Sequence, residues 1–505
     1  MAASLLSTGT RAADVLSPFG RPQIRIDFTN QRDGNLAPSF TTGDRIEGTV
    51  TISAAHLISF DEVDIKLEGT QTVTVERGAV PGRSGATQTF LRLRQPMQDS
   101  SYPTPRVIEP ARTYQFPFTF VVPRGLLPHV CSHSKKNAHV HHSHTLLPPS
   151  LGDPMLAQNG KTLLDDMSPD MTRVTYQIRA EVLQKPVVGP AKSLKVTQRK
   201  IRILPAVEEE PPLTVLDNDP VYRTRREKDV KRGTLRPRQG RLVAAASQPK
   251  PLQLNPPNKE PESVSTAATV HLRFDPVGDE EPPRLGTIWS KLRVATYYAA
   301  HPWEDYPNSS AVSVVGMTGD GVYYDTVPLS KMCLASAQWT KHASSTSSTL
   351  VRRDSLQSTS SAESITGPTA CFSGDVYYTA SVVVPVTLPK DKAFVPTFHS
   401  CLISRVYTLD LCVSYHTPNM NILTPTVSLK IPIQLTSGSS NTDSSGKSDE
   451  VITQEEVDAE FFSPRSVAPP AIDGADAVAP PEYSDLAEYH RSSPLPGPRP
   501  QIVPL

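Results

Sequence analysis

The chain has 505 residues, of which 37% are hydrophobic and 50 are proline, so part of its length is expected to lie outside any core. Its 51 basic and 51 acidic side chains give a net charge of +0, which excludes a global electrostatic attraction to nucleic acid or to acidic membranes. No apolar run approaches the ~20 residues that span a bilayer, and the N-terminal sequence lacks the charged start and apolar stretch of a secretory signal.

The cysteines are few, odd in number and scattered. They are Cys131, Cys333, Cys371, Cys401 and Cys412. Such a set fits a reducing compartment better than a disulfide framework, because structural disulfides need cysteines in pairs. We therefore expect the chain to be cytoplasmic.

Residues 1–20 carry no strand pattern and are expected to be disordered. From residue 21 to residue 204, short segments alternate apolar and polar residues, as half-buried strands do. These segments are 24–28, 46–52, 63–69, 72–76, 90–94, 114–121, 174–182 and 195–201. Many short strands without a ten-residue helical pattern predict a β-sandwich over residues 21–204. Pro117 and Pro123 should lie at a sheet edge, a bulge or a strand end, where no backbone N–H is needed.

Histidine is concentrated in residues 129–144, between two of these predicted strands, together with one cysteine. Imidazole and thiolate both bind zinc, so Cys131, His141 and His144 are candidate ligands, and His141 and His144 are close enough to share an ion. However, the spacing matches no zinc finger, no carboxylate is placed as a general base, and two lysines within the segment would oppose a cation. The favoured interpretation is a polar loop without a metal or other cofactor; a loose zinc site and a pH-sensitive contact are the alternatives.

The alternation stops at residues 205–219, where a run of glutamate followed by two prolines predicts a linker. Residues 223–241, which follow it, carry nine Lys or Arg against two acids. The favoured interpretation is a solvated strand and turn. One alternative is a patch that contacts anionic lipid headgroups, at ~1 kcal/mol per basic residue. Nuclear localisation or nucleic-acid contact is another, but we expect no nucleic-acid partner because no nucleic-acid-binding fold accompanies the patch. The candidate lipid-contacting residues are Arg223, Arg225, Arg226, Lys231 and Arg232.

A second set of alternating segments occupies residues 220–436. They are 240–247, 270–274, 291–298, 376–386, 404–413 and 427–435. This half is again all-β, so two tandem sandwiches are the economical architecture. A Ser/Thr-rich insertion, residues 343–367, is expected to be disordered because it has almost nothing to bury. Within it, Ser355 follows two arginines in the pattern that basophilic kinases prefer, although a solvated loop that no kinase modifies is the alternative.

Residues 437–505 form a low-complexity tail that is expected to be disordered. It contains Pro480-Pro481-Glu482-Tyr483, a PPxY sequence of the type that WW domains bind. The two prolines favour a polyproline II helix, which loses little entropy on docking, and Tyr483 would fill a second pocket. Leu486 could add a smaller apolar contact. The alternative is a chance match in a proline-rich chain.

Several segments in both halves resemble one known family in their order and spacing. They are 114–120 (YQFPFTF), 126–128 (LLP), 147–152 (LPPSLG), 176–180 (YQIRA), 384–386 (VPV), 396–398 (PTF), 403–409 (ISRVYTL) and 430–433 (KIPI). On these residues the chain resembles the arrestin superfamily over about residues 21–436, and in particular the alpha-arrestin-like proteins of fungi. The resemblance implies two immunoglobulin-like β-sandwiches, no catalysis and a PPxY tail that recruits HECT-type ubiquitin ligases. We assign no residues of this sequence to the charged cluster that holds visual arrestins inactive. The resemblance is therefore not taken to imply activation by receptor phosphates.

The favoured function is therefore a non-enzymatic adaptor. The sandwiches would bind a membrane receptor or transporter cargo, and the tail would bring a WW-domain HECT-type ubiquitin ligase for ubiquitylation and endocytic trafficking. The protein would be cytoplasmic and recruited to the plasma membrane or endosomes, with peripheral membrane association and with a kinase and phospho-binding partners acting through Ser355. One alternative is a signalling scaffold, in an ambient-pH or stress pathway, to which the ligase is incidental. Another, a zinc-dependent enzyme, rests only on the histidines; the sequence contains none of the common nucleotide-binding, hydrolase or metalloprotease motifs.

Overall fold

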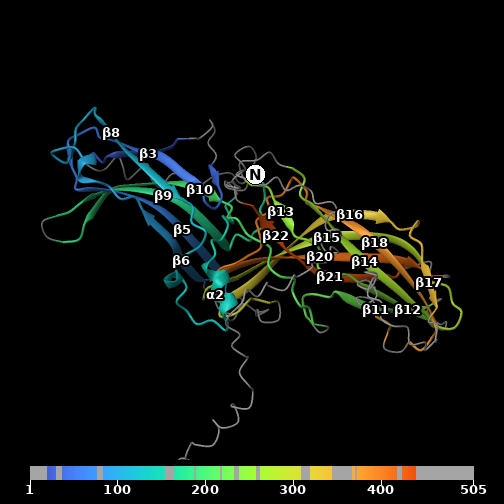
Figure 1. The fold of residues 1–505 in the computed structure, drawn as a ribbon. Helices are drawn as coiled ribbons and strands as arrows, with labels where there is room; N and C mark the ends of the chain where they lie inside the picture. Colours follow the sequence, from blue (N-terminus) through green and yellow to red (C-terminus); the bar gives the residue numbers. More distant parts are fainter. Residues whose placement is uncertain are drawn as a thin grey trace, which may run out of the picture. The chain divides into compact units, whose positions relative to one another are not determined.

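Strands make up most of the computed structural model, and the all-β prediction is confirmed (Figure 1). The structure describes residues 20–29, 37–76, 83–153, 164–186, 189–216, 219–231, 238–256, 262–308, 319–343, 367–369, 372–417 and 424–438. Among them are one α-helix, α2 (Ala138–Thr145), and two short 3-10 helices, η1 (Asp99–Ser101) and η2 (Pro128–Val130). All of the described residues belong to one unit, Met1–Thr442.

Ten strands before residue 204 form three sheets. The strands are β1 (Gln23–Phe28), β2 (Ser39–Phe40), β3 (Arg45–Ser53), β4 (Ile58–Ser59), β5 (Glu62–Glu76), β6 (Arg83–Arg94), β7 (Val107–Ile108), β8 (Thr113–Val121), β9 (Thr172–Gln184) and β10 (Lys192–Ile203). One sheet has the order β1-β3-β8, a larger one has the order β2-β10-β9-β5-β6, and β4 pairs with β7. Most of these pairs are antiparallel, and β2 and β10 are parallel.

Twelve further strands form the remaining sheets. They are β11 (Arg225–Lys231), β12 (Arg238–Ala245), β13 (Leu252–Leu254), β14 (Ser265–Pro276), β15 (Arg284–Ala299), β16 (Asp320–Cys333), β17 (Thr340–Ala343), β18 (Val376–Thr387), β19 (Phe398–His399), β20 (Ile403–His416), β21 (Thr426–Ile433) and β22 (Leu435–Ser437). One sheet has the order β11-β12-β14-β18-β17, and a second has the order β16-β15-β20-β19 with β21 also paired to β20. The short strands β13 and β22 form a parallel pair.

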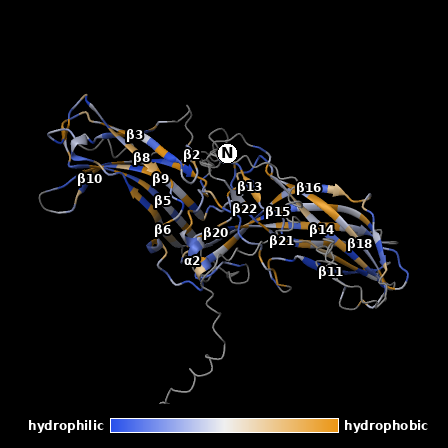
Figure 2. Ribbon diagram, in the orientation of Figure 1, coloured by the Kyte–Doolittle hydropathy of each residue, from blue (hydrophilic) through white to orange (hydrophobic). Residues whose placement is uncertain are grey.

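Buried side chains of the strands form two large hydrophobic cores, and hydrophobic and hydrophilic residues form contrasting bands along the strands (Figure 2). In β8, for example, Phe116, Phe118 and Phe120 are buried while the residues between them are exposed. These rings share a core with Leu67 of β5 and Tyr176 of β9, so two sheets face each other in a sandwich-like packing. Each such buried side chain contributes ~1.5–3 kcal/mol relative to an exposed one, so this packing is the main stabilising term of the fold.

The first core also draws on residues that lie late in the sequence. Phe398, Cys401 and Ile403, from β19, the following turn and β20, pack into the same apolar cluster as the early strands. The hydroxyl of Ser400 donates a hydrogen bond of 2.7 Å to the side-chain oxygen of Gln71 in β5. The β19–β20 turn is thus held against the early sheets, where it contributes to the site described below.

Several predicted strand limits need correction. Residues 63–69 and their continuation, 72–76, form the single strand β5 as expected, but 90–94 is only the end of β6. Residues 427–435 were predicted as one strand, but β21 ends at Ile433 and Leu435 begins β22, which pairs in a different sheet. The two strands separate because the Leu435 backbone N–H donates to the hydroxyl of Thr397 and because residues 435–437 pair with β13.

The prediction for Pro117 is confirmed. This proline lies in β8 opposite Thr49 of β3. Because β8 is the last strand in the order β1-β3-β8, it is an edge strand, in which a missing N–H on the open side breaks no ladder. Pro123 follows the end of β8, as expected for a strand end.

A glycine in β3 allows close packing that no other residue would permit. A Cβ atom at Gly48 would lie 2.4 Å from the backbone oxygen of Asp27 and 2.5 Å from Cζ of Phe118. We expect Gly48→Ala to lower the free energy of unfolding by roughly 1–3 kcal/mol, because a backbone carbonyl in a sheet cannot move away cheaply. Denaturant unfolding measures the change.

Gly85 in β6 provides the matched control for this substitution. The nearest atom to a Cβ at Gly85 is the Val73 backbone oxygen at 3.4 Å, an ordinary contact. Gly85→Ala should therefore leave stability within about 1 kcal/mol of the wild type, since the added methyl mainly restricts the unfolded chain. Equal losses for the two variants would contradict the steric argument.

Candidate metal centre

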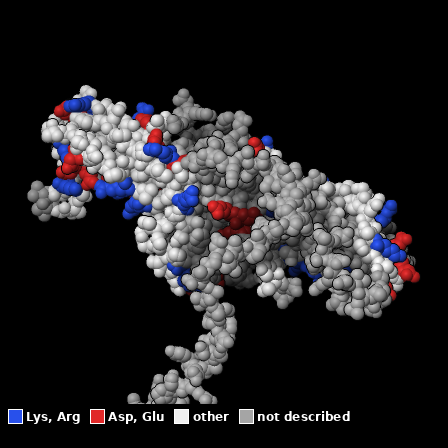
Figure 3. All heavy atoms as spheres, viewed as in Figure 1, with Lys and Arg blue, Asp and Glu red and all other residues white. Residues whose placement is uncertain are grey.

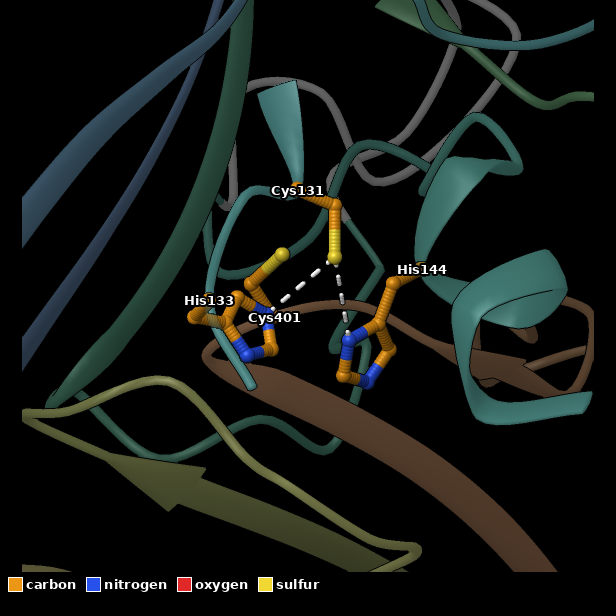
Figure 4. A group of neighbouring side chains, drawn as sticks. All are labelled: Cys131, His133, His144 and Cys401. Carbon is orange, nitrogen blue, oxygen red and sulfur yellow. Dashed lines mark hydrogen bonds between the residues drawn. The ribbon is translucent and has the colours of Figure 1, made fainter. Parts of the chain in front are cut away.

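Four side chains with metal-binding atoms converge between α2 and the β19–β20 turn (Figure 4). Cys131 and His133 lie in the loop after η2, His144 lies on α2, and Cys401 lies in the turn before β20. Their donor atoms all lie within 4.8 Å of one another. Three chain segments, one of them far away in the sequence, thus supply one cluster.

Helix α2 determines where His144 points. The side chain of Asn137 caps the helix by accepting a 3.0 Å hydrogen bond from the backbone N–H of Val140, which satisfies one of the free donors at the helix N-terminus. The helix buries Val140, Ser143 and His144. Residues three and four apart share one face of a helix, so His144 lies on the buried face together with Val140. The expectation of a polar loop is therefore wrong for Ala138–Thr145.

The Cys131 sulfur lies close to both histidine rings of the cluster. Cys131 Sγ lies 3.2 Å from His133 Nε2 and 3.6 Å from His144 Nδ1. The rings of His133 and His144 are 5.4 Å apart between centroids. Cys131, His144 and Cys401 are buried, and His133 is half-buried. The four groups therefore share a space from which solvent is largely excluded.

Burial sets the protonation of this cluster. Burial, reinforced by the neighbouring His133, lowers the pKa of His144 to about 3. His144 is therefore neutral at pH 7, the form of imidazole that binds a metal. Burial, reinforced by Cys131, raises the pKa of the Cys401 thiol to about 12. A buried thiol of this kind becomes a thiolate when a cation binds it, because the metal charge outweighs the cost of desolvation.

A chain of buried and part-buried hydrogen bonds positions the segments that carry both cysteines. The Gln71 side-chain amide donates to the Gln88 oxygen at 2.7 Å, and the Gln88 amide donates to the backbone oxygen of Val130 at 2.9 Å. At the other end, Ser400 donates to Gln71. Val130 precedes Cys131 and Ser400 precedes Cys401, so two glutamines of the β5–β6 hairpin connect the backbones beside the two thiols. Supporting contacts of this kind commonly orient metal ligands.

The two lysines of this segment point in different directions. The Lys135 ammonium donates to the backbone oxygen of Cys131 and lies 3.5 Å from its sulfur. In that position its positive charge helps to lower the pKa of His144. Lys136 instead forms an ion pair of 3.1 Å with Asp305. The expectation that the lysines oppose a cation therefore holds for Lys135, which lies beside the donor atoms, but not for Lys136, which is paired elsewhere.

The structure brings together part of the ligand set considered from the sequence. Cys131 and His144 belong to the cluster, whereas His141, on the same helix, does not. His133 was part of the histidine-rich segment but was not singled out, and Cys401 was noted only as one of the scattered cysteines. The Cys-x-His spacing of Cys131 and His133 was a usable local signal. No local signal marks Cys401, which reaches the site only through the fold.

The basic segment contributes to two strands, β11 and the start of β12, in which several charges are already engaged. Arg225 forms a 2.7 Å ion pair with Glu227, and Arg226 donates to Ser428 at 2.9 Å. Arg223 is exposed and pairs through its backbone with Lys430, and Lys231 is exposed. Arg232 lies outside the described residues. Basic and acidic side chains also lie close to one another on the face shown in Figure 3, so this view reveals no broad basic surface.

The remaining sequence candidates lie outside the described residues. These are Ser355 and the tail residues Pro480, Pro481, Tyr483 and Leu486. Within the described part of the chain, no helix is both long and apolar enough to span a membrane. No protein-family model matches the sequence, and a search of curated proteins finds no match.

Proposed function

We propose that the chain is a non-enzymatic, arrestin-like adaptor. Its β-sheet body binds a membrane receptor or transporter, and its tail recruits a WW-domain HECT-type ubiquitin ligase to that cargo for ubiquitylation and endocytic trafficking. The protein is cytoplasmic and moves to the plasma membrane or endosomes when cargo is bound.

The observation that carries this proposal is the PPxY sequence at Pro480–Tyr483. A WW domain binds such a ligand through a groove for the proline pair and a pocket for the tyrosine ring. The short peptide needs no fold of its own, because the prolines already favour the bound backbone conformation. A ligand of this kind on a β-sheet body is the arrangement that an adaptor needs, with one part for cargo and another for the ligase.

The described body is consistent with two tandem immunoglobulin-like sandwiches, over residues 21–204 and 220–436. The two largest apolar clusters of the described residues, each lined by facing sheets, support this architecture. The family-like segments also occupy buried positions of the kind expected for fold signatures: 114–120 lies in β8 and 403–409 in β20. Tyr176, in another such segment, donates a 2.6 Å hydrogen bond to the Pro148 backbone oxygen and so links two of the segments.

Peripheral lipid contact remains a smaller part of the proposal. Arg225 and Arg226 already contact protein groups, so β11 offers fewer free cations than its composition suggests. Arg223 and Lys231 are the exposed described residues of the candidate set, so they are the ones proposed to meet a headgroup. Ser355 remains the candidate site at which a kinase, and then a phospho-binding partner, would act.

A signalling scaffold is the second candidate. In a scaffold, the ligase-binding tail would be incidental to the signalling function. The two functions differ in what happens to cargo when the ligase is lost. An adaptor loses cargo ubiquitylation, whereas a scaffold keeps its pathway output.

Proximity labelling in the native cell tests the proposal. The full chain, fused to a biotin-transferring enzyme, should label both a HECT-type ligase and a membrane protein. Pro481→Ala should reduce ligase labelling roughly tenfold or more, because the substitution removes a ring from the groove and loosens the helix. Cargo labelling should be unchanged, and cargo ubiquitylation should fall with ligase labelling.

Pro496→Ala is the matched control, since it removes a proline from the same tail outside the motif. It should behave as the wild type. Cargo ubiquitylation that persists when Pro481→Ala has lost the ligase would favour the scaffold. Ligase labelling unaffected by Pro481→Ala would overturn the proposed mode of recruitment.

A further inference from the structure

We propose that Cys131, His133, His144 and Cys401 bind one zinc ion. The ion would join α2 and the loop before it to the turn between β19 and β20. This inference goes beyond the adaptor function and does not depend on it.

The geometry matches a tetrahedral site before any metal is added. Zinc binds sulfur at ~2.3 Å and histidine nitrogen at ~2.0 Å, so sulfur and nitrogen ligands of one tetrahedral ion lie roughly 3.5 Å apart. The two sulfur–nitrogen distances at Cys131 are 3.2 Å and 3.6 Å. All four donor atoms fall within 4.8 Å of one another, so small rotations about side-chain bonds bring them to a common centre. In Figure 4 the four side chains converge on a single space.

The donor set selects the metal. Thiolate and imidazole ligands suit zinc, whereas calcium and magnesium require oxygen ligands. Two thiolates and two neutral imidazoles carry a charge of −2, which Zn²⁺ neutralises. Neutralisation matters here because three of the four residues are buried, and an unpaired charge would be costly in that environment.

The site is structural rather than catalytic. Catalytic zinc ions have three protein ligands and keep one position open for water, whereas structural zinc ions have four protein ligands. Cys131, His133, His144 and Cys401 together fill a tetrahedral shell. The cluster therefore gives no support to a zinc-dependent enzyme. It does include two of the zinc ligands considered from the sequence, Cys131 and His144.

The surrounding hydrogen bonds prepare the site. The Gln71–Gln88 pair and Ser400 hold the backbones beside Cys131 and Cys401, two cysteines that are far apart in the sequence. Lys135 donates to the backbone oxygen of Cys131 and lies 3.5 Å from its sulfur, so it contacts the loop that carries the first ligand. A bound ion would therefore stabilise the packing of α2 and the β19–β20 turn against the early sheets. Its loss should loosen that contact before it unfolds either core.

Metal analysis of the full chain tests the assignment. Protein purified under reducing conditions without chelator should contain about one zinc per chain. After zinc is removed, titration with Co²⁺ should produce the strong visible bands of a tetrahedral ion with thiolate ligands, and zinc should displace it. Chelation should lower the melting temperature by roughly 5–10 °C, because the metal binds only the folded state.

Two histidines of one helix provide matched variants. His144→Ala should abolish stoichiometric zinc and the cobalt bands, whereas His141→Ala should retain both, since His141 lies outside the donor set. Cys401→Ser and Cys333→Ser form a second pair, in which only the first should lose the metal. If His144→Ala fails to fold, the effect of chelator on the wild-type melting temperature still decides the question.

Three results would overturn the proposal. One is wild-type protein without stoichiometric zinc and without thiolate–cobalt bands. Another is equal zinc content in the His144→Ala and His141→Ala variants. The third is a disulfide between Cys131 and Cys401 that is still present after purification under reducing conditions, which would show that the two sulfurs bond each other rather than a metal.

Discussion

Arg405→Met is expected to lower the free energy of unfolding by about 2–4 kcal/mol, one of the largest effects of any single change in the body. Arg405 lies in β20 and is fully buried. Its guanidinium donates to the backbone oxygens of Asp166 at 3.0 Å and Met167 at 3.3 Å. Methionine fills similar space but donates nothing, so both carbonyls would lose their buried donor.

The consequences of this change extend beyond two hydrogen bonds. The segment that accepts from Arg405 also contacts a second element, since Asp165 forms a 2.7 Å ion pair with Lys392. The Asp166 side chain accepts from the backbone N–H of Gly152 at 2.7 Å. Without the guanidinium, the loop at Asp165–Met167 would lose the contact that fixes it to β20. The carbonyls belong to the backbone, so no compensating side-chain substitution can remove them.

Denaturant unfolding with two companion variants separates geometry from charge. Arg405→Lys keeps a positive charge but cannot reach both carbonyls with a rigid fork, so it should also destabilise the protein. Arg25→Met is the surface control, because Arg25 forms only an exposed ion pair with Asp27 and should change stability by less than about 1 kcal/mol. A loss for Arg405→Met no larger than that for Arg25→Met would contradict the assigned role.

Many of the strands could be predicted because each of them carries its own periodic signal, whereas β16, whose buried residues do not alternate regularly, was not predicted. In β3 and β8 the alternation of apolar and polar residues matches the alternation of buried and exposed ones along the whole strand. The pattern does not show where a strand ends or which strand it pairs with, because these depend on tertiary contacts. Residues 427–435 read as one strand, yet the partners β20 and β13 divide them between two sheets. Helix α2 escaped prediction because eight residues rich in histidine carry no helical period, and its main sequence signal is the cap at Asn137.

The candidate metal centre was only partly visible in the sequence for a similar reason. Cys131, His141 and His144 are close in the sequence, so their residue types alone made zinc an alternative; of these, Cys131 and His144 belong to the cluster, and His133 was not singled out. Cys401 supplies the fourth ligand from the β19–β20 turn, and the packing of that turn onto the first core brings it near. A single cysteine in an apolar context resembles any buried cysteine, so only the fold distinguishes it.

Tyr483→Ala is expected to weaken binding of WW domains to the tail by about 100-fold or more. The tyrosine supplies the large ring that fills its own pocket, and alanine leaves that pocket empty. Pro481→Ala should also weaken binding severely, because it removes both a contact and the preference for the polyproline II backbone. Leu486→Ala should cost less, because Leu486 adds only a smaller apolar contact beyond the motif. None of these changes should alter the stability of the body, since the tail belongs to a different unit from the described residues.

Calorimetry of a tail peptide containing Pro480–Tyr483 with isolated WW domains measures these effects directly. Tyr489→Ala provides the matched control, because Tyr489 lies in the same tail but follows no proline pair. A WW ligand should distinguish the two tyrosines, whereas a nonspecific contact with a proline-rich peptide should not. Equal affinities for the wild-type and Tyr483→Ala peptides would reduce the motif to coincidence. That result would remove the main support for ligase recruitment, while leaving the zinc proposal to be judged by metal content alone.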